Sequence, residues 1–148
     1  MTKRVLFLCT HNSARSQMAE GLLRWLTDGR VESYSAGTEK TLVRPAAIEV
    51  MKELGIDIRE QFSKTLDGFI DDRFDYVITV CDHANETCPF FAHAENRWHW
   101  SIDDPSLVTV SAQARLDAFR TARDSLRERI QAELLPSLLS DQGMSDLA

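Results

Sequence analysis

The chain has 148 residues, the size of one domain, and 43% of them are hydrophobic, which is enough for a single packed core. Its net charge of −6 disfavours nucleic acid as a partner, and it has no apolar run of membrane-spanning length. The three cysteines are an odd number, and no signal peptide precedes the first predicted strand. We therefore expect a cytoplasmic monomer with reduced thiols and no membrane attachment.

Apolar runs bounded by turn residues predict four strands, at residues 4–9, 31–36, 76–80 and 97–100. The first and third are almost entirely apolar, so both faces of each are expected to be buried, as in a parallel sheet. Helical spacing predicts helices at 14–28 and 45–54, which end near Gly29 and Gly55. Residues 56–69 are expected to form a polar connection with a short helical turn.

A long last helix is predicted to begin after Ser111, whose hydroxyl can cap it. Its inner stripe consists of Leu116, Phe119, Ala122, Leu126, Ile130 and Leu134. Pro136 is expected to end or bend this helix, because proline lacks the N–H of a helical hydrogen bond. Residues 1–139 are then one domain, and residues 140–148 a flexible tail.

This alternation of strands and helices predicts an α/β fold, a single doubly wound domain with a four-stranded parallel sheet flanked by helices. Ligands of such sheets bind at the carboxyl ends of the strands. Cys9 ends the first predicted strand, and Cys81 and Asp104 follow the third and fourth. The sequence therefore predicts one composite site at that edge.

The segment from Cys9 to Ser16 joins the first strand directly to a helix N-terminus, where backbone N–H groups can converge on an oxyanion. The positive end of the helix dipole is expected to lower the pKa of Cys9 and make it a nucleophile. Arg15 adds a planar fork of donors. The alternative is a buried structural cysteine. The predicted oxyanion-binding residues are Thr10, His11, Asn12, Ser13, Ala14, Arg15 and Ser16.

Cys81 and Cys88 form a second group of thiols, and their spacing is not that of a zinc knuckle. His83 could join them in a metal site, or the two thiols could be unrelated. If residues 81–88 were helical, the two Cα atoms would lie about 10.5 Å apart, whereas a disulfide needs roughly 4.4–6.8 Å. A disulfide between them would therefore require the segment, rich in poor helix formers, to unwind.

Asp104 precedes Pro105 at the end of the fourth predicted strand. A carboxyl group facing an oxyanion site can act as a general acid toward a leaving oxygen. The alternative is a turn-forming Asp-Pro pair, and Asp103 is an alternative acid. We favour Asp104 because the proline fixes its loop.

Four stretches, at residues 8–20, 33–38, 81–89 and 99–105, resemble the thioredoxin-coupled arsenate reductases built on the low-molecular-weight tyrosine phosphatase fold. The resemblance covers nearly the whole chain. The nucleophile loop and the Asp-Pro loop are shared with the phosphatases, whereas the additional cysteines, Cys81 and Cys88, distinguish the reductases.

The resemblance implies a three-cysteine relay. Cys9 attacks arsenate held by the loop and Arg15, and Asp104 protonates the departing oxygen. Cys81 then attacks Cys9, arsenite leaves, and a transient Cys9–Cys81 disulfide forms. Cys88 attacks Cys81, and thioredoxin reduces the Cys81–Cys88 disulfide. No cofactor is bound, phosphate and sulfate are competing oxyanions, and each thiol exchange needs a thiolate.

The sequence also departs from the family pattern. His11 stands where many relatives have glycine, which restricts the loop backbone. Lys64 stands where some relatives have an aspartate that contributes to a potassium site, so we expect no metal ion. The donor could also be a glutaredoxin or mycothiol system.

Two other functions remain open from the sequence. One is a tyrosine phosphatase of the same fold, with Cys81 and Cys88 as bystanders. Ser106, Leu107 and Val108 follow the Asp-Pro pair, where a phosphatase would have tyrosines, and this argues against it. The other is a non-enzymatic anion-binding or redox-sensing module, which the complete set of nucleophile, arginine and acid disfavours.

Overall fold

The computed structural model describes residues 2–81 and 94–140. The strands are β1 (Arg4–Cys9), β2 (Glu32–Gly37), β3 (Phe74–Thr79) and β4 (Ala94–His99). The α-helices are α1 (Arg15–Leu26), α2 (Pro45–Lys52), α4 (Ala112–Arg129) and α5 (Leu135–Ser140). Three short segments are the 3-10 turns η1 (Leu66–Phe69) and η2 (Pro105–Leu107) and the π-helical turn η3 (Ile130–Leu134).

Two predictions fall on other parts of the chain. Cys88 and His83 lie outside the described residues, as does the unwinding of 81–88, so these remain predictions. The tail prediction falls largely on 141–148, which also lies outside them, although Ser140 is the last residue of α5. In the described ranges, no helix is both long enough and apolar enough to cross a membrane.

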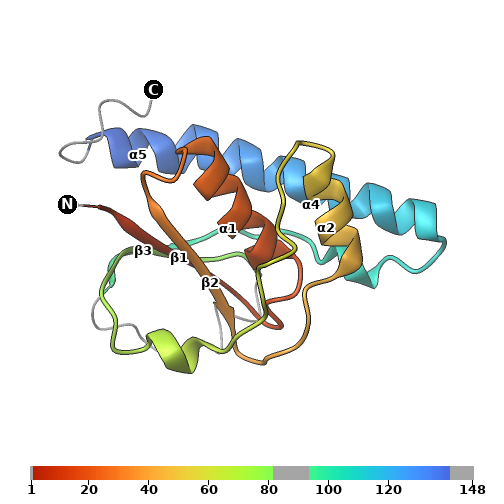
Figure 1. Cartoon of the computed structure of the whole chain (residues 1–148), viewed down its shortest axis with the longest axis horizontal. Coiled ribbons are helices and arrows are strands. Elements are labelled where there is room, and N and C mark those ends of the chain that lie inside the picture. The colour runs from red at the N-terminus through yellow and green to blue at the C-terminus, as the bar shows by residue number, and fades with distance from the viewer. Residues whose placement is uncertain (1, 82–93, 141–148) are drawn as a thin grey trace.

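The four strands form one parallel sheet in the order β2-β1-β3-β4 (Figure 1). Leu8 pairs with Ala36 of β2 on one side and with Thr79 of β3 on the other. The strand order reverses between β1 and β3, and this is the point at which doubly wound sheets bind ligands. The predicted fold class is confirmed.

The side chains of β1 alternate between two buried clusters, as the period of a strand requires. Val5, Phe7 and Cys9 face the larger core, which α1, α2, α4 and α5 cover (Figure 1). Leu6 and Leu8 face a smaller cluster that includes η1. Both faces of β1 are therefore buried, which explains its almost unbroken apolar sequence.

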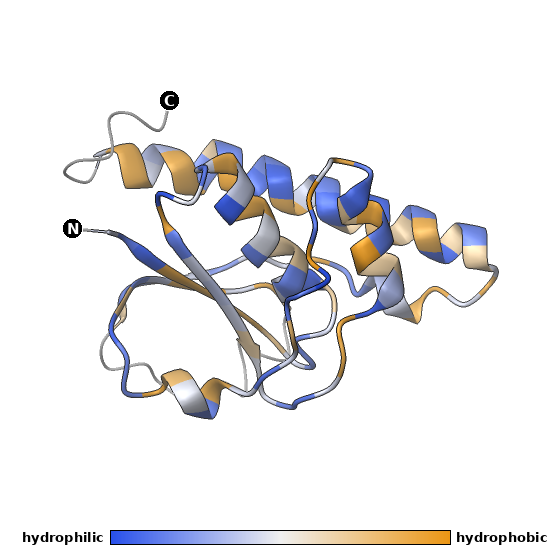
Figure 2. Ribbon diagram, viewed as in Figure 1, coloured by the Kyte–Doolittle hydropathy of each residue, from blue (hydrophilic) through white to orange (hydrophobic). Residues whose placement is uncertain are grey.

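The last helix begins as predicted, because the Ser111 hydroxyl accepts a hydrogen bond from the Ala114 N–H at 3.0 Å. Apolar and polar residues alternate along α4 and α5 (Figure 2). Pro136, however, does not end the helix. The Leu135 N–H bonds to the Ile130 carbonyl, five residues back, in the wide η3 turn. The helix therefore continues through Pro136 to Ser140.

An ionic cluster joins α2 to α4. Glu53, directly after α2, accepts hydrogen bonds from Arg120 at 2.7 Å and from Arg123 at 2.7 Å. Arg123 is only 8% exposed and also donates to the Val50 carbonyl at 2.8 Å. Hydrogen bonds from Arg120 and Arg123 lower the pKa of Glu53 from 4.5 to about 2.

This shift makes stability depend on acid pH. A carboxyl group whose pKa is lowered by folding stabilises the protein above its unfolded pKa and loses that effect as pH falls through its folded pKa. We expect Glu53→Gln to lower the free energy of unfolding at pH 7, and the difference from the native chain to shrink between about pH 4.5 and about pH 2. Urea denaturation at several pH values measures this difference.

The matched control is Glu128→Gln, an exposed acid on α4 for which we find no ion pair within the described ranges. It should leave the free energy of unfolding nearly unchanged across the same pH range. A Glu53→Gln chain whose stability deficit stays constant with pH would contradict the assignment.

Candidate active site

Main-chain hydrogen bonds bring the three predicted site segments to one edge of the sheet. The Val80 N–H donates to the Leu8 carbonyl at 2.8 Å, which places the residue before Cys81 beside the end of β1. The Trp100 N–H donates to the Thr79 carbonyl at 2.8 Å, which continues the pairing of β3 with the chain after β4. The segments that carry Cys9, Cys81 and Asp104 therefore meet, as predicted.

A pocket of about 540 Å³ opens at this edge. It is lined by Thr10, His11, Arg15, Glu39, Cys81, Ser101, Ile102, Asp103 and Asp104. Its volume is ample for a tetrahedral oxyanion.

The nucleophile loop turns through Asn12, which has a left-handed backbone with φ 49°. Asparagine tolerates this conformation better than most residues. The turn brings the Asn12 N–H to 3.2 Å from the Cys9 sulfur. The Ser16 hydroxyl lies 2.8 Å from the same sulfur and accepts a hydrogen bond from the Asn12 amide, so its own proton is free to point at Cys9.

Neighbouring segments hold this loop from behind. The Asn12 side-chain oxygen accepts hydrogen bonds from Gln17 at 2.8 Å and from the Lys64 N–H at 3.0 Å. Gly37, at the end of β2, lies so close that a Cβ atom there would come within 2.7 Å of the Thr10 carbonyl oxygen. Only glycine permits this approach.

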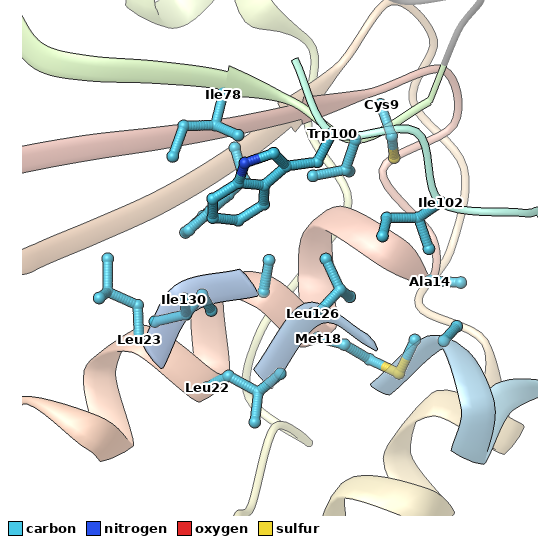
Figure 3. Close-up of a cluster of buried hydrophobic side chains, with 14 of the residues drawn as sticks. Cys9, Ala14, Met18, Leu22, Leu23, Ile78, Trp100, Ile102, Leu126 and Ile130 are labelled. Atoms are coloured by element: carbon cyan, nitrogen blue, oxygen red, sulfur yellow. The ribbon is translucent and has the colours of Figure 1, made fainter. Parts of the chain in front are cut away.

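Cys9 is 3% exposed and belongs to the large buried cluster together with Ile102 and Ala14 (Figure 3). Burial raises the pKa of its thiol above the ordinary value. Hydrogen bonds from Ser16 and the charge of Arg15 act in the opposite direction but do not outweigh burial. The predicted lowering of this pKa is therefore wrong for this conformation, and Cys9 rests as a protonated thiol.

Arg15 and Asp104 face each other across the pocket. The Arg15 Nη1 donates to the Ile102 carbonyl at 2.8 Å, and Nη2 lies 3.6 Å from Oδ2 of Asp104. The other carboxylate oxygen, Oδ1, accepts from the Ser106 N–H at 2.9 Å and from its hydroxyl at 2.7 Å. The carboxylate is thus held with Oδ2 toward Arg15.

These contacts keep Asp104 ionised. Burial alone would raise the pKa of its carboxyl group, but the Ser106 hydrogen bonds and the charges of Arg15 and Arg44 together bring that pKa below the ordinary value. The resting site therefore pairs a protonated thiol with a carboxylate.

Cys81 lies beside the nucleophile loop. Its sulfur is 3.3 Å from the Thr10 hydroxyl and lines the pocket. Both described cysteines are free thiols, and a negative charge on Cys81 would raise the pKa of Cys9, which reflects how close they are. A second thiol therefore lies beside the loop that carries the predicted nucleophile.

The predicted oxyanion-binding residues divide into two groups. Thr10, His11 and Arg15 line the pocket. The others are buried behind its surface, where they shape the loop: Asn12, Ser13, Ala14 and Ser16. Ser13 contributes a carbonyl that accepts the Arg44 N–H at 2.8 Å.

Sequence reasoning missed several residues at the site, among them Ser106 and Glu39. Ser106 fixes Asp104, and the only available signal was a serine two residues after an aspartate, a common turn pattern. Glu39 lines the pocket after β2, and nothing in its local sequence indicated this.

Lys64 lies beside a buried carboxylate. Its ammonium group is 3.7 Å from Glu20, which also accepts a hydrogen bond from Ser35 at 2.5 Å and pairs with Arg24 at 2.7 Å. Burial lowers the pKa of Lys64, while the charge of Glu20 opposes that shift. Among the described residues, no cluster of three or more His, Cys, Asp or Glu side chains could hold a metal ion. The expectation of no metal stays a prediction.

Known proteins are similar to this chain in both sequence and fold. Residues 4–142 match the low molecular weight phosphotyrosine protein phosphatase family. An arsenate reductase from Halalkalibacterium halodurans is 42% identical over 132 residues, which cover 88% of this chain and 95% of that protein.

Two solved structures are also similar. An arsenate reductase in the phosphate-binding state superposes with a TM-score of 0.77 at 34% identity, over 99% of this chain and 100% of that one. The thioredoxin-dependent arsenate reductase of Corynebacterium glutamicum superposes with a TM-score of 0.64 at 28% identity, over 88% of this chain and 62% of that one. The chain therefore belongs to the low molecular weight phosphotyrosine protein phosphatase family, in which it groups with the arsenate reductases.

Proposed function

We propose that this enzyme reduces arsenate to arsenite through a relay of Cys9, Cys81 and Cys88, with thioredoxin as the electron donor. The main observation in support is the Cys81 sulfur, which Thr10 holds beside the nucleophile loop at 3.3 Å. Hydrolysis of a phosphate ester needs no such thiol. Relatives are named arsenate reductases, and one is named thioredoxin-dependent.

In the first step arsenate occupies the pocket beside Arg15, and the Cys9 sulfur attacks arsenic. A sulfur–arsenic bond forms and an arsenic–oxygen bond breaks. The proton of the Cys9 thiol leaves with the departing hydroxide as water, so the step needs no outside acid. Asp104 begins as a carboxylate, takes up that proton and delivers it to the leaving oxygen.

In the second step the Cys81 sulfur attacks the Cys9 sulfur. The sulfur–arsenic bond breaks toward arsenic, which gains two electrons and leaves as arsenite, and the two sulfurs are oxidised to a disulfide. The Cys81 proton passes to an arsenite oxygen. The short distance between Thr10 and Cys81 favours this attack, because the thiol is already held at the loop.

In the third step Cys88 attacks Cys81, which frees Cys9 as a thiol and leaves a Cys81–Cys88 disulfide. The two thiols of reduced thioredoxin then return this disulfide to two thiols and become a disulfide themselves. Such a cycle suits a reducing compartment, and we place the enzyme in the cytoplasm.

The relay predicts different losses for two cysteine variants. With Cys88→Ser, turnover with thioredoxin should fall to background while one equivalent of arsenite per enzyme is still released, because only regeneration needs Cys88. With Cys9→Ser, both the turnover with thioredoxin and the release of one equivalent of arsenite should be lost. Arsenate-dependent NADPH oxidation with thioredoxin and thioredoxin reductase measures turnover, and arsenite analysis without reductant measures the single equivalent.

A glutaredoxin system in the same assay tests the donor. Undiminished multiple turnover by Cys88→Ser would rule out the relay. Hydrolysis of an aryl phosphate, without arsenite release, would favour the phosphatase instead.

The proton-transfer role predicts a slow first step for Asp104→Asn. The amide cannot carry the proton, so single-turnover release of arsenite should slow by about 100-fold, while thiol exchange is retained. Rapid-quench measurement of arsenite follows this step. Asp103→Asn is the matched control, because Asp103 lines the same pocket. If arsenite release is slow in Asp103→Asn and fast in Asp104→Asn, the proton-transfer role belongs to Asp103 instead of Asp104.

A further inference from the structure

The pocket mouth carries an ion pair that the relay does not use. Nε2 of His11 lies 3.0 Å from Oε2 of Glu39, and both side chains are about half exposed and line the pocket. Their backbones are fixed, since the Glu39 N–H donates to the Thr10 carbonyl at 2.9 Å and the Thr41 hydroxyl donates to the His11 carbonyl at 2.8 Å. The pair is therefore part of the nucleophile loop's own framework.

The charges around the pocket present a problem for anion binding. Without His11, its lining carries one guanidinium, Arg15, against three carboxylates, Glu39, Asp103 and Asp104. Arg15 already faces Asp104 at 3.6 Å. A doubly charged oxyanion entering this pocket would meet excess negative charge, which weakens binding at such short range.

We propose that His11 is a positioning residue for oxyanion capture. It pairs with Glu39 at 3.0 Å and so offsets the charge of that carboxylate at the pocket mouth. Dianionic oxyanions then bind more tightly than they would to a pocket whose Glu39 carboxylate lacks this partner. This inference rests on the proposed function, because it takes the pocket as the arsenate site. Arsenate, phosphate and sulfate share the chemistry on which it depends.

Charged and titratable groups face the pocket from every surrounding element. They are Glu39 after β2, Arg15 of α1, Cys81 after β3, and Asp103 and Asp104 after β4, with Arg44 acting on Asp104. Carboxylates outnumber the guanidinium groups that line the pocket, so the partner of Glu39 affects the charge that an oxyanion meets there.

Sulfate is the probe, since it is a dianion that takes no part in electron transfer. Calorimetric titration at one pH and one ionic strength should show a sulfate affinity about three- to tenfold lower for His11→Gln than for the native chain.

Glu39→Gln should bind sulfate more tightly than the native chain, because a negative charge leaves the pocket mouth. Glu133→Gln is the matched control: Glu133 forms a comparable ion pair with Arg129, at 2.9 Å, on the last helix. It should leave sulfate affinity unchanged.

Equal sulfate affinity in the native and His11→Gln chains, or weaker binding by Glu39→Gln, would overturn the inference. Sulfate binding involves no electron transfer, so these results are independent of the relay. A chain that binds sulfate as predicted but releases no arsenite would contradict only the proposed function.

Discussion

The parallel pairing of β1 with β3 is the constraint on which the site depends. Leu8 pairs with Thr79, and the Val80 N–H continues the ladder to the Leu8 carbonyl at 2.8 Å. This register brings Cys9 and Cys81 to one edge. A slip of one residue would turn each side chain of the strand to the opposite face, and Cys81 would then point away from the nucleophile loop. Main-chain hydrogen bonds between β1 and β3 thus determine that Cys9 and Cys81 lie at the same edge of the sheet.

Burial and neighbouring charges have opposite effects on the pKa values of the two reactive groups of the site. The apolar cluster around Cys9 shields it from solvent but disfavours its thiolate, and Ser16 and Arg15 recover only part of that effect. Asp104 is kept ionised by Ser106 and the neighbouring guanidinium groups. In the resting protein the Cys9 thiol therefore carries a proton and the Asp104 carboxylate can accept one. This pairing is suited to proton transfer once an oxyanion is bound.

Local patterns were sufficient to predict much of the fold. The apolar run of β1, the cap at Ser111 and the inner stripe of α4 depend on neighbouring residues, and each was found in the structure. Of the two outcomes predicted for Pro136, the end of the helix is not found, because the five-residue hydrogen bond of η3 widens the helix just before it. Rules based on α-helical hydrogen bonds do not anticipate that accommodation.

The site was predicted less completely than the fold. Short-range spacing was enough to propose Cys9 and Arg15, because one loop carries both. The pKa of Cys9 depends on how deeply distant segments bury it, which residue spacing does not determine. Glu39 reaches the pocket only through the placement of β2 beside β1, and Ser106 became informative only once Asp104 was known to face Arg15.

The close approach of Gly37 to the nucleophile loop has a consequence for binding. Because β2 touches the Thr10 carbonyl and the Asn12 N–H without an intervening side chain, the loop loses its conformational freedom when the protein folds rather than when a ligand arrives. An anion that enters such a preorganised cradle does not have to order the loop, so more of its interaction energy appears as affinity. Gly37, which has no side chain, thus contributes to anion affinity without contacting the anion.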